Sequence, residues 1–119
     1  MYEISGAQRA GGLLVSLSGI LHLIAPAIGG VTGFALGLLA IGVVYIAMGA
    51  LITRGWRSLA YPAFLCALFG GIAAMAISFG GMGGIPAWWG LSVWIIDWIA
   101  AAALFVALWV SRPERLQES

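Results

Sequence analysis

The sequence predicts an all-α polytopic membrane protein with four transmembrane helices in an up-down-up-down bundle. Of its 119 residues, 63% are hydrophobic and only 8% are charged, whereas about a quarter of the residues of a soluble domain are charged. The hydrophobic residues fall into four segments of about 20 residues, the helical length that crosses a hydrocarbon core about 30 Å thick. Basic residues occur only before the first segment, between the second and the third, and after the fourth.

The predicted spans run over about 10–28, 33–53, 59–79 and 87–110, so residues 1–119 form a single domain. Backbone groups in lipid must bond within their own segment, so each span is expected to be a helix. The prolines lie near the ends of spans, and no kink is expected at a span centre. Short connections should make consecutive helices antiparallel neighbours, and the glycine-rich connection 80–84 is interpreted as a flexible turn.

The basic residues predict the orientation. They precede the first span, separate the second from the third and follow the fourth, at Arg9, Arg54, Arg57, Arg112 and Arg115. The connections 26–32 and 80–86 carry no charge. Because positive charge stays on the cytoplasmic side, both termini and the middle connection are expected there. The absence of lysine and the abundance of glycine and alanine favour a bacterial source, and therefore the inner membrane.

Small residues should form the contacts between the helices, because membrane helices associate through close packing. The candidates on the second and third spans are Gly33, Gly37, Gly42, Gly49, Ala63, Ala67 and Gly71. Stripes of this kind can also serve contacts between chains. The single cysteine, Cys66, is interpreted as a small buried hydrophobic residue. Four tryptophans near span ends are interpreted as interface anchors, namely Trp56, Trp88, Trp89 and Trp109.

Two ionisable side chains stand out at membrane depth, His22 in the first span and Asp97 in the fourth. A carboxylate at a helix centre costs about 2.5–3.5 kcal/mol on insertion scales, so it should find a partner or be neutral. At about 1.5 Å per residue, His22 lies about 20 Å from Arg9 and Asp97 about 22 Å from Arg112. The two side chains are therefore expected at similar depth, facing each other, with Ser18 sharing a hydrogen bond between them.

Three interpretations of this polar pair stay open. It could be a structural clamp that fixes helix register, or a site for ion or proton transport in a small oligomeric transporter or channel. In the third, His22 would ligate haem or chlorophyll. A second axial histidine is absent from the chain, so bis-histidine ligation would need a second copy.

The sequence offers no enzyme signature: it has no second carboxylate at depth, no metal-binding cluster and no phosphate loop. A net charge of +1 without a basic stripe argues against nucleic acid as a partner. The leading hypothesis is a non-enzymatic membrane bundle without a cofactor. It would act as an accessory or assembly subunit, surrounded by lipid, in a homo-oligomer or a larger membrane complex.

The first span carries Gly19-Ile20-Leu21-His22-Leu23-Ile24-Ala25-Pro26 and ends at an external proline. With the chain length and the four spans, this segment resembles the small bacterial four-helix membrane proteins that include the DoxX-like families. The resemblance covers the chain in outline and has no matching polar signature in the second and third spans. It implies the fold and the membrane location, and an association of some members with redox partner complexes.

Overall fold

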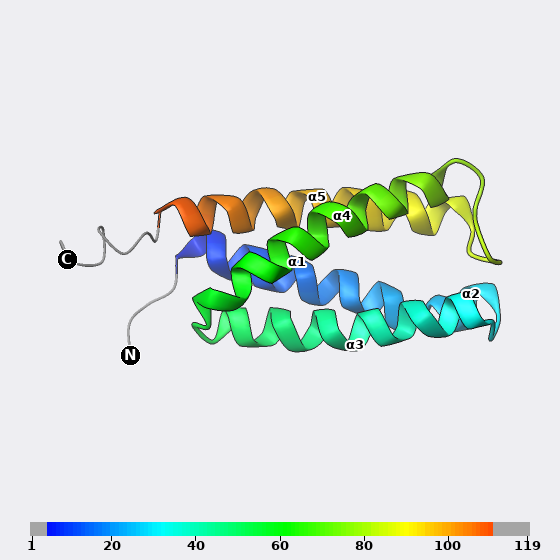
Figure 1. Ribbon diagram of the computed structural model, residues 1–119, viewed down its shortest axis with the longest axis horizontal. Coiled ribbons are helices and arrows are strands. Elements are labelled where there is room, and N and C mark those ends of the chain that lie inside the picture. The colour runs from blue at the N-terminus through cyan, green and yellow to red at the C-terminus, as the bar shows by residue number, and fades with distance from the viewer. Residues whose placement is uncertain (1–4, 111–119) are drawn as a thin grey trace.

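The computed structural model describes residues 5–110 and confirms the all-α fold (Figure 1). Its helices are α1 (Gly6–Leu23), α2 (Ala25–Gly29), α3 (Gly33–Thr53), α4 (Ala60–Ser78) and α5 (Ala87–Val110), with a 3-10 turn η1 (Arg57–Leu59) before α4. Four stretches are long and apolar enough to cross a membrane, the first of them formed by α1 and α2 together. The predicted spans agree with these stretches to within a few residues.

Hydroxyl side chains cap the first two spans. The Ser5 hydroxyl accepts a hydrogen bond from the backbone N–H of Gln8 at 3.0 Å, and the Thr32 hydroxyl accepts one from the N–H of Ala35 at 3.1 Å. These bonds satisfy donors that have no partner in the first turn of a helix. Each cap therefore fixes the residue at which its span begins.

The first span is interrupted near its outer end, where Ile24 separates α1 from α2. Pro26 lies in the first turn of α2 and has no N–H to donate back into α1. Just before the break, the carbonyl of Leu21 accepts a hydrogen bond of 2.8 Å from the indole N–H of Trp89 on α5. Trp89 is 1% exposed, so its role is internal packing, which corrects its interpretation as an interface anchor.

The four spans do not form a closed square. Helix α1 packs against both α3 and α5, and α4 packs along α5. Helices α3 and α4 touch far less, although only a short connection joins them. In Figure 1, α4 leaves the end of α3 and crosses in front of α1 to lie along α5. The expectation that all consecutive helices are close neighbours is therefore wrong for α3 and α4, because α5 takes the small-residue face of α4.

Two pairs of glycines bring α1 and α3 into close contact. A β-carbon added to Gly42 would lie 2.6 Å from the carbonyl oxygen of Gly19, and one added to Gly12 would lie 2.9 Å from that of Gly49. The seven-residue spacing of Gly42 and Gly49 matches that of Gly12 and Gly19 in the antiparallel partner. Such small residues let two backbones approach closely.

Gly33 and Gly37 do not take part in this contact. A β-carbon added to either glycine would meet no atom within 4 Å, leaving aside its own helix backbone. This GxxxG pair therefore makes no contact with another helix within residues 5–110. The prediction that Gly33 and Gly37 form helix contacts is wrong for this part of the chain.

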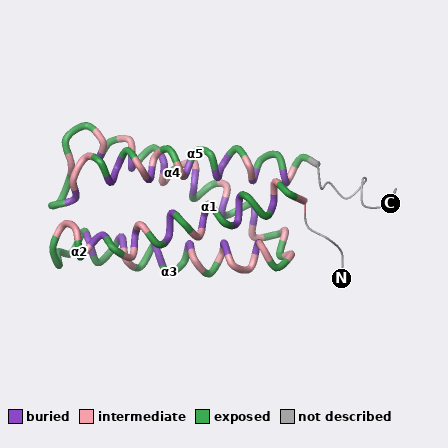
Figure 2. Tube along the Cα trace, turned by 180° about the vertical axis from the view of Figure 1, so that it is seen from behind, coloured by how far each residue is buried: buried purple, intermediate pink, exposed green. Residues whose placement is uncertain are grey.

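The α4–α5 contact uses the predicted small residues of α4. Ala63, Ala67 and Gly71 are buried at helical spacing on one face of α4, and the Trp98 ring of α5 lies directly against Gly71. Buried and exposed residues alternate along each helix in Figure 2, so every span has one packed face and one outward face. Large apolar side chains such as Phe69 point outward, as in a protein surrounded by lipid.

The connection between α4 and α5 is a glycine-rich turn closed by backbone hydrogen bonds. Four glycines take positive φ values, at positions 80, 81, 83 and 84. Met82 and Ile85 exchange backbone hydrogen bonds of 3.0 and 2.9 Å, and Ile85 is 1% exposed. The glycines thus give a turn over the end of α3, where Gly83 lies against Phe34.

At the opposite end, the antiparallel order of the helices brings together Arg9, Arg54 and Arg57. Arg57 donates a hydrogen bond of 3.0 Å to the carbonyl of Leu108, which ties the start of α4 to the end of α5. Arg112 and Arg115 lie outside the described residues. The side of the membrane that this end faces stays a prediction from the charge pattern.

Candidate functional site

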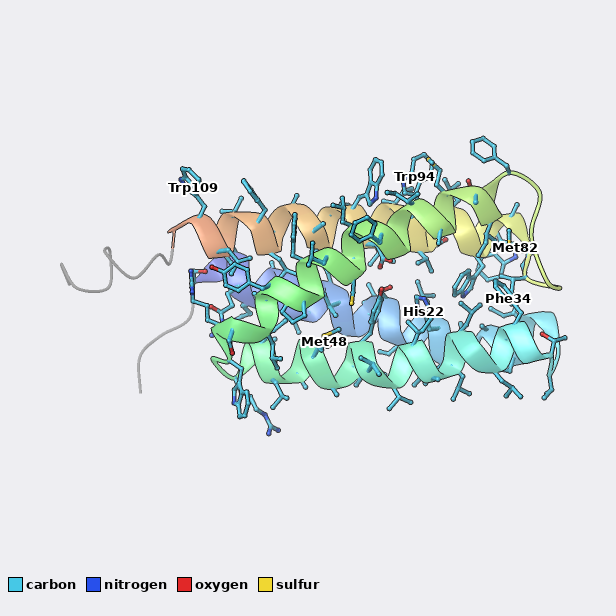
Figure 3. All side chains as sticks on the ribbon, viewed as in Figure 1. His22, Phe34, Met48, Met82, Trp94 and Trp109 are labelled. Carbon is cyan, nitrogen blue, oxygen red and sulfur yellow. The ribbon has the colours of Figure 1, made fainter. Side chains whose placement is uncertain are left out.

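A groove runs along the side of the bundle where α3 and α4 separate. It has a volume of about 390 Å³ and is lined by Ala40, Ile41, Val44, Tyr45, Cys66 and Gly70. A smaller cavity of about 80 Å³ reaches inward from the same place to His22 and Trp89. Ile41, Tyr45 and Gly70 line both spaces, so the groove and the cavity lie next to each other. In Figure 3, His22 lies in the region between α3 and α4.

His22 is held in one orientation by its own helix. Its Nδ1 lies 2.7 Å from the carbonyl oxygen of Ser18, one turn earlier. A carbonyl only accepts, so Nδ1 carries the proton and Nε2 keeps a lone pair in the neutral ring. The rings of Tyr45 and Trp89 meet the imidazole edge to face, with centroids 5.2 and 5.1 Å away. His22 is 5% exposed.

Tyr45 links the groove to the polar centre. Its ring is buried on α3, and its hydroxyl donates a hydrogen bond of 2.9 Å to the carbonyl of Cys66 on α4. This bond spans the floor of the groove where the two helices diverge. Because the hydroxyl proton is used in this bond, the Tyr45 oxygen remains free to accept from another group.

Asp97 is buried near the Tyr45 hydroxyl. It is 1% exposed, and neither carboxylate oxygen has a hydrogen-bond partner within residues 5–110. A β-carbon added to Gly70 would lie 2.6 Å from the Tyr45 hydroxyl and 3.1 Å from Oδ2 of Asp97. Both oxygens therefore border the space that a side chain at Gly70 would take. Asp97 is directed toward α4, at the level of the groove.

The expected hydrogen bond between His22 and Asp97 is not formed. The imidazole proton goes to the Ser18 carbonyl, and the carboxylate stays without a partner in the described part of the chain. The Ser18 hydroxyl lies close to Asp97, but it does not reach hydrogen-bond geometry. Tyr45 lies between the predicted partners: its ring meets His22 and its hydroxyl lies near Asp97. The sequence missed this residue between them.

The surroundings of His22 leave little room for a macrocycle. The cavity beside the imidazole measures about 80 Å³, whereas ligand sites usually measure about 300–1,000 Å³. Two aromatic rings and the Ser18 carbonyl also occupy positions around the ring. Haem or chlorophyll ligation by His22 would require Tyr45 or Trp89 to move. Within residues 5–110 there is no group of three His, Cys, Asp or Glu side chains able to hold a metal ion.

Two residues of the site were not predicted. Tyr45 carries no signal in the sequence, because a single tyrosine in an apolar span can equally face lipid. Cys66 is exposed on the wall of the groove, which corrects its interpretation as a buried residue. Both positions depend on the divergence of α3 from α4, and this angle cannot be derived from the length of their connection.

No family model, curated protein or solved structure matches this chain. The fold and the site by themselves define a four-helix apolar bundle, consistent with an integral membrane protein, that has a groove on one side. Tyr45 and Gly70 of the groove lining adjoin a buried group of polar residues formed by His22, Tyr45 and Asp97.

Proposed function

We propose that the protein is a non-enzymatic membrane bundle that binds another membrane component in the groove between α3 and α4. In this role it acts as an accessory or assembly subunit. The bound component covers the open side of the bundle and supplies the hydrogen-bond partner that Asp97 lacks within residues 5–110.

The observation that carries this proposal is the unpartnered carboxylate beside the groove. Both oxygens of Asp97 are buried without a hydrogen bond, and a carboxylate at this depth costs about 2.5–3.5 kcal/mol on insertion scales. Buried polar groups with no partner are rare, and each calls for an explanation. A component bound in the groove offers one, because Gly70 lines the groove and a β-carbon added to it would lie 3.1 Å from Oδ2.

The groove also has the character of a binding site for a lipid-soluble component. Its lining is almost entirely apolar, and its volume of about 390 Å³ lies within the usual range for ligand sites. The small residues Ala40 and Gly70 keep it open on both walls.

Cys66 provides a direct test, because it is the only cysteine of the chain and lies on the wall of the groove. The rate at which N-ethylmaleimide modifies Cys66 would be measured in native membranes and again after purification and reconstitution into pure phospholipid nanodiscs. A bound component should protect Cys66, so modification should be slower in the native membrane.

The matched control carries Cys66→Ser and Leu65→Cys. Leu65 lies at almost the same depth on α4, is 50% exposed and is not part of the groove lining. Its modification should proceed at the same rate in both membranes. If Cys66 reacts as fast in the native membrane as in nanodiscs, relative to position 65, the groove has no resident component and the proposal fails.

A further inference from the structure

We infer that the component bound in the groove is a lipophilic amine, with a protonated amino group directed at Asp97 and an apolar body in the groove. This inference rests on the proposed function and names the chemistry of the bound component. It follows from the hydrogen-bonding roles of the buried polar groups, the aromatic rings beside them and the shape of the space.

The polar groups at the inner end of the groove have more acceptor capacity than protons left to give. Within residues 5–110, neither carboxylate oxygen of Asp97 is in hydrogen-bond geometry with a donor, and the Ser18 hydroxyl close to it is also without a partner. The Tyr45 hydroxyl has donated its proton to the Cys66 carbonyl, and the proton on Nδ1 of His22 is engaged with Ser18. What remains is an oxygen lone pair on Tyr45 and a nitrogen lone pair on His22. An ammonium group has three donors and no acceptor, and so complements this set.

Charge and ring geometry favour the same ligand. Within residues 5–110, the basic side chains lie at the arginine end of the bundle, so no cation of the chain itself sits at the depth of Asp97. The rings of Tyr45, His22 and Trp89 cluster within 5.2 Å between neighbouring centroids. Tyrosine and tryptophan faces attract ammonium groups, the more so away from water. The site thus combines a carboxyl group with aromatic rings.

Gly70 lines the groove and lies close to the carboxylate. It has no side chain at the point where a β-carbon would lie 2.6 Å from the Tyr45 hydroxyl and 3.1 Å from Oδ2 of Asp97. Alanine at this position would place a methyl group against both oxygens. Both carboxylate oxygens are buried, so we infer that a small head group from the groove reaches Asp97 through a local opening at Gly70, where no side chain blocks the approach.

The space fits a small amphiphile better than a second copy of the chain. Exposed side chains along the groove-facing helices α3 and α4 are overwhelmingly apolar, and the arginines of another copy would lie at its ends. A second copy would thus bring no cation to this depth. A volume of about 390 Å³ corresponds to a drug-sized molecule or one alkyl chain.

The test uses the full chain in nanodiscs, with dodecylamine as the probe and dodecanol as the neutral molecule of the same chain length. Each is titrated while the rate of Cys66 modification by N-ethylmaleimide is followed. Dodecylamine should protect Cys66 at a concentration at least about tenfold lower than dodecanol, the ratio expected from one additional charged contact. Asp97→Asn keeps the side-chain size and should remove this advantage.

Two glycine variants test the approach of the amine to Asp97 without changing Asp97 itself. Gly70→Ala keeps Asp97 and should weaken protection by the amine, because its methyl group closes the route to the carboxylate. Gly37→Ala is the matched control, since a β-carbon there meets nothing within 4 Å, and it should behave as the wild type. Helical circular dichroism of each variant verifies that the fold is retained.

The outcomes distinguish the inference from the function on which it rests. The inference would be overturned if the amine and the alcohol protected Cys66 equally, or if Asp97→Asn left the protection by the amine unchanged. In either case, slow modification of Cys66 in native membranes would still support a bound component. If native mass spectrometry finds a polypeptide bound at the groove, the amine is wrong and a protein partner takes its place. Loss of protection with the amine in Asp97→Asn and in Gly70→Ala, but not in Gly37→Ala, supports the inference.

Discussion

The close contact between α1 and α3 makes Gly42→Ala a sharp test of the packing. The new β-carbon would lie 2.6 Å from the carbonyl oxygen of Gly19, 2.9 Å from the β-carbon of His22 and 3.1 Å from the backbone nitrogen of Leu23. Two of these atoms belong to the backbone of α1, so side-chain rotation cannot relieve the contact. The helices must separate, and overpacking of this kind typically costs about 1–3 kcal/mol.

Gly37→Ala on the same helix isolates this cost. Replacing glycine by alanine in a helix interior favours folding by about 1 kcal/mol through backbone conformation alone, and this gain applies to both variants. Gly37 has open space where its β-carbon would be placed, so only Gly42→Ala carries the destabilising cost of overpacking. The free energy of unfolding of Gly42→Ala should therefore be lower than that of Gly37→Ala by about 1–3 kcal/mol.

The two free energies can be measured by reversible unfolding in mixed micelles, with helical circular dichroism as the signal. The comparison between variants cancels effects of the micelle that are common to both. Equal stability of the two variants would refute the reasoning, because it would mean that α1 and α3 do not meet at Gly42. A larger loss for Gly37→Ala would place the contact on the opposite face of α3.

The remaining predictions concern other parts of the bundle. Trp89→Phe removes the indole N–H that bonds the carbonyl before the break in the first span, and should lower the free energy of unfolding by about 0.5–1.5 kcal/mol; an unchanged value would mean that this bond does not stabilise the bundle. In a Cys66→Ser background, Met82→Cys should react with an impermeant thiol reagent from outside and Ser58→Cys should not, because the basic ends stay in the cytoplasm; the reverse labelling would invert the orientation. Protein purified from its native membrane should show no visible absorption band, since the cavity beside His22 is small; a band lost in His22→Ala would restore the haem or chlorophyll hypothesis.

The sequence predicted the membrane spans well, because their length and hydrophobicity follow directly from the thickness of the bilayer. It also placed Gly42, Gly49 and the small residues of α4 on packing faces, since close approach of membrane helices requires such residues. Gly33 and Gly37 carry the same signal and face no partner. Local spacing alone cannot tell a contact inside the chain from an outward face.

The candidate site was predicted only in part. Charge and depth singled out His22 and Asp97, but the hydrogen bond between them required side-chain directions that a helical period does not give. The imidazole found a closer acceptor in the Ser18 carbonyl of its own helix. Tyr45 and the groove depend on how far α3 and α4 diverge, which is decided by the packing of α4 on α5.

The central claim, that the groove between α3 and α4 holds a membrane component, is tested most directly by native mass spectrometry of the protein released from its own membrane. Ala40→Trp would fill the groove, and Val43→Trp would add the same ring to an exposed position of α3 outside the groove lining. The account predicts a bound mass on the wild type and on Val43→Trp that Ala40→Trp loses. A bare wild-type chain, or a bound mass that Ala40→Trp retains, would contradict it.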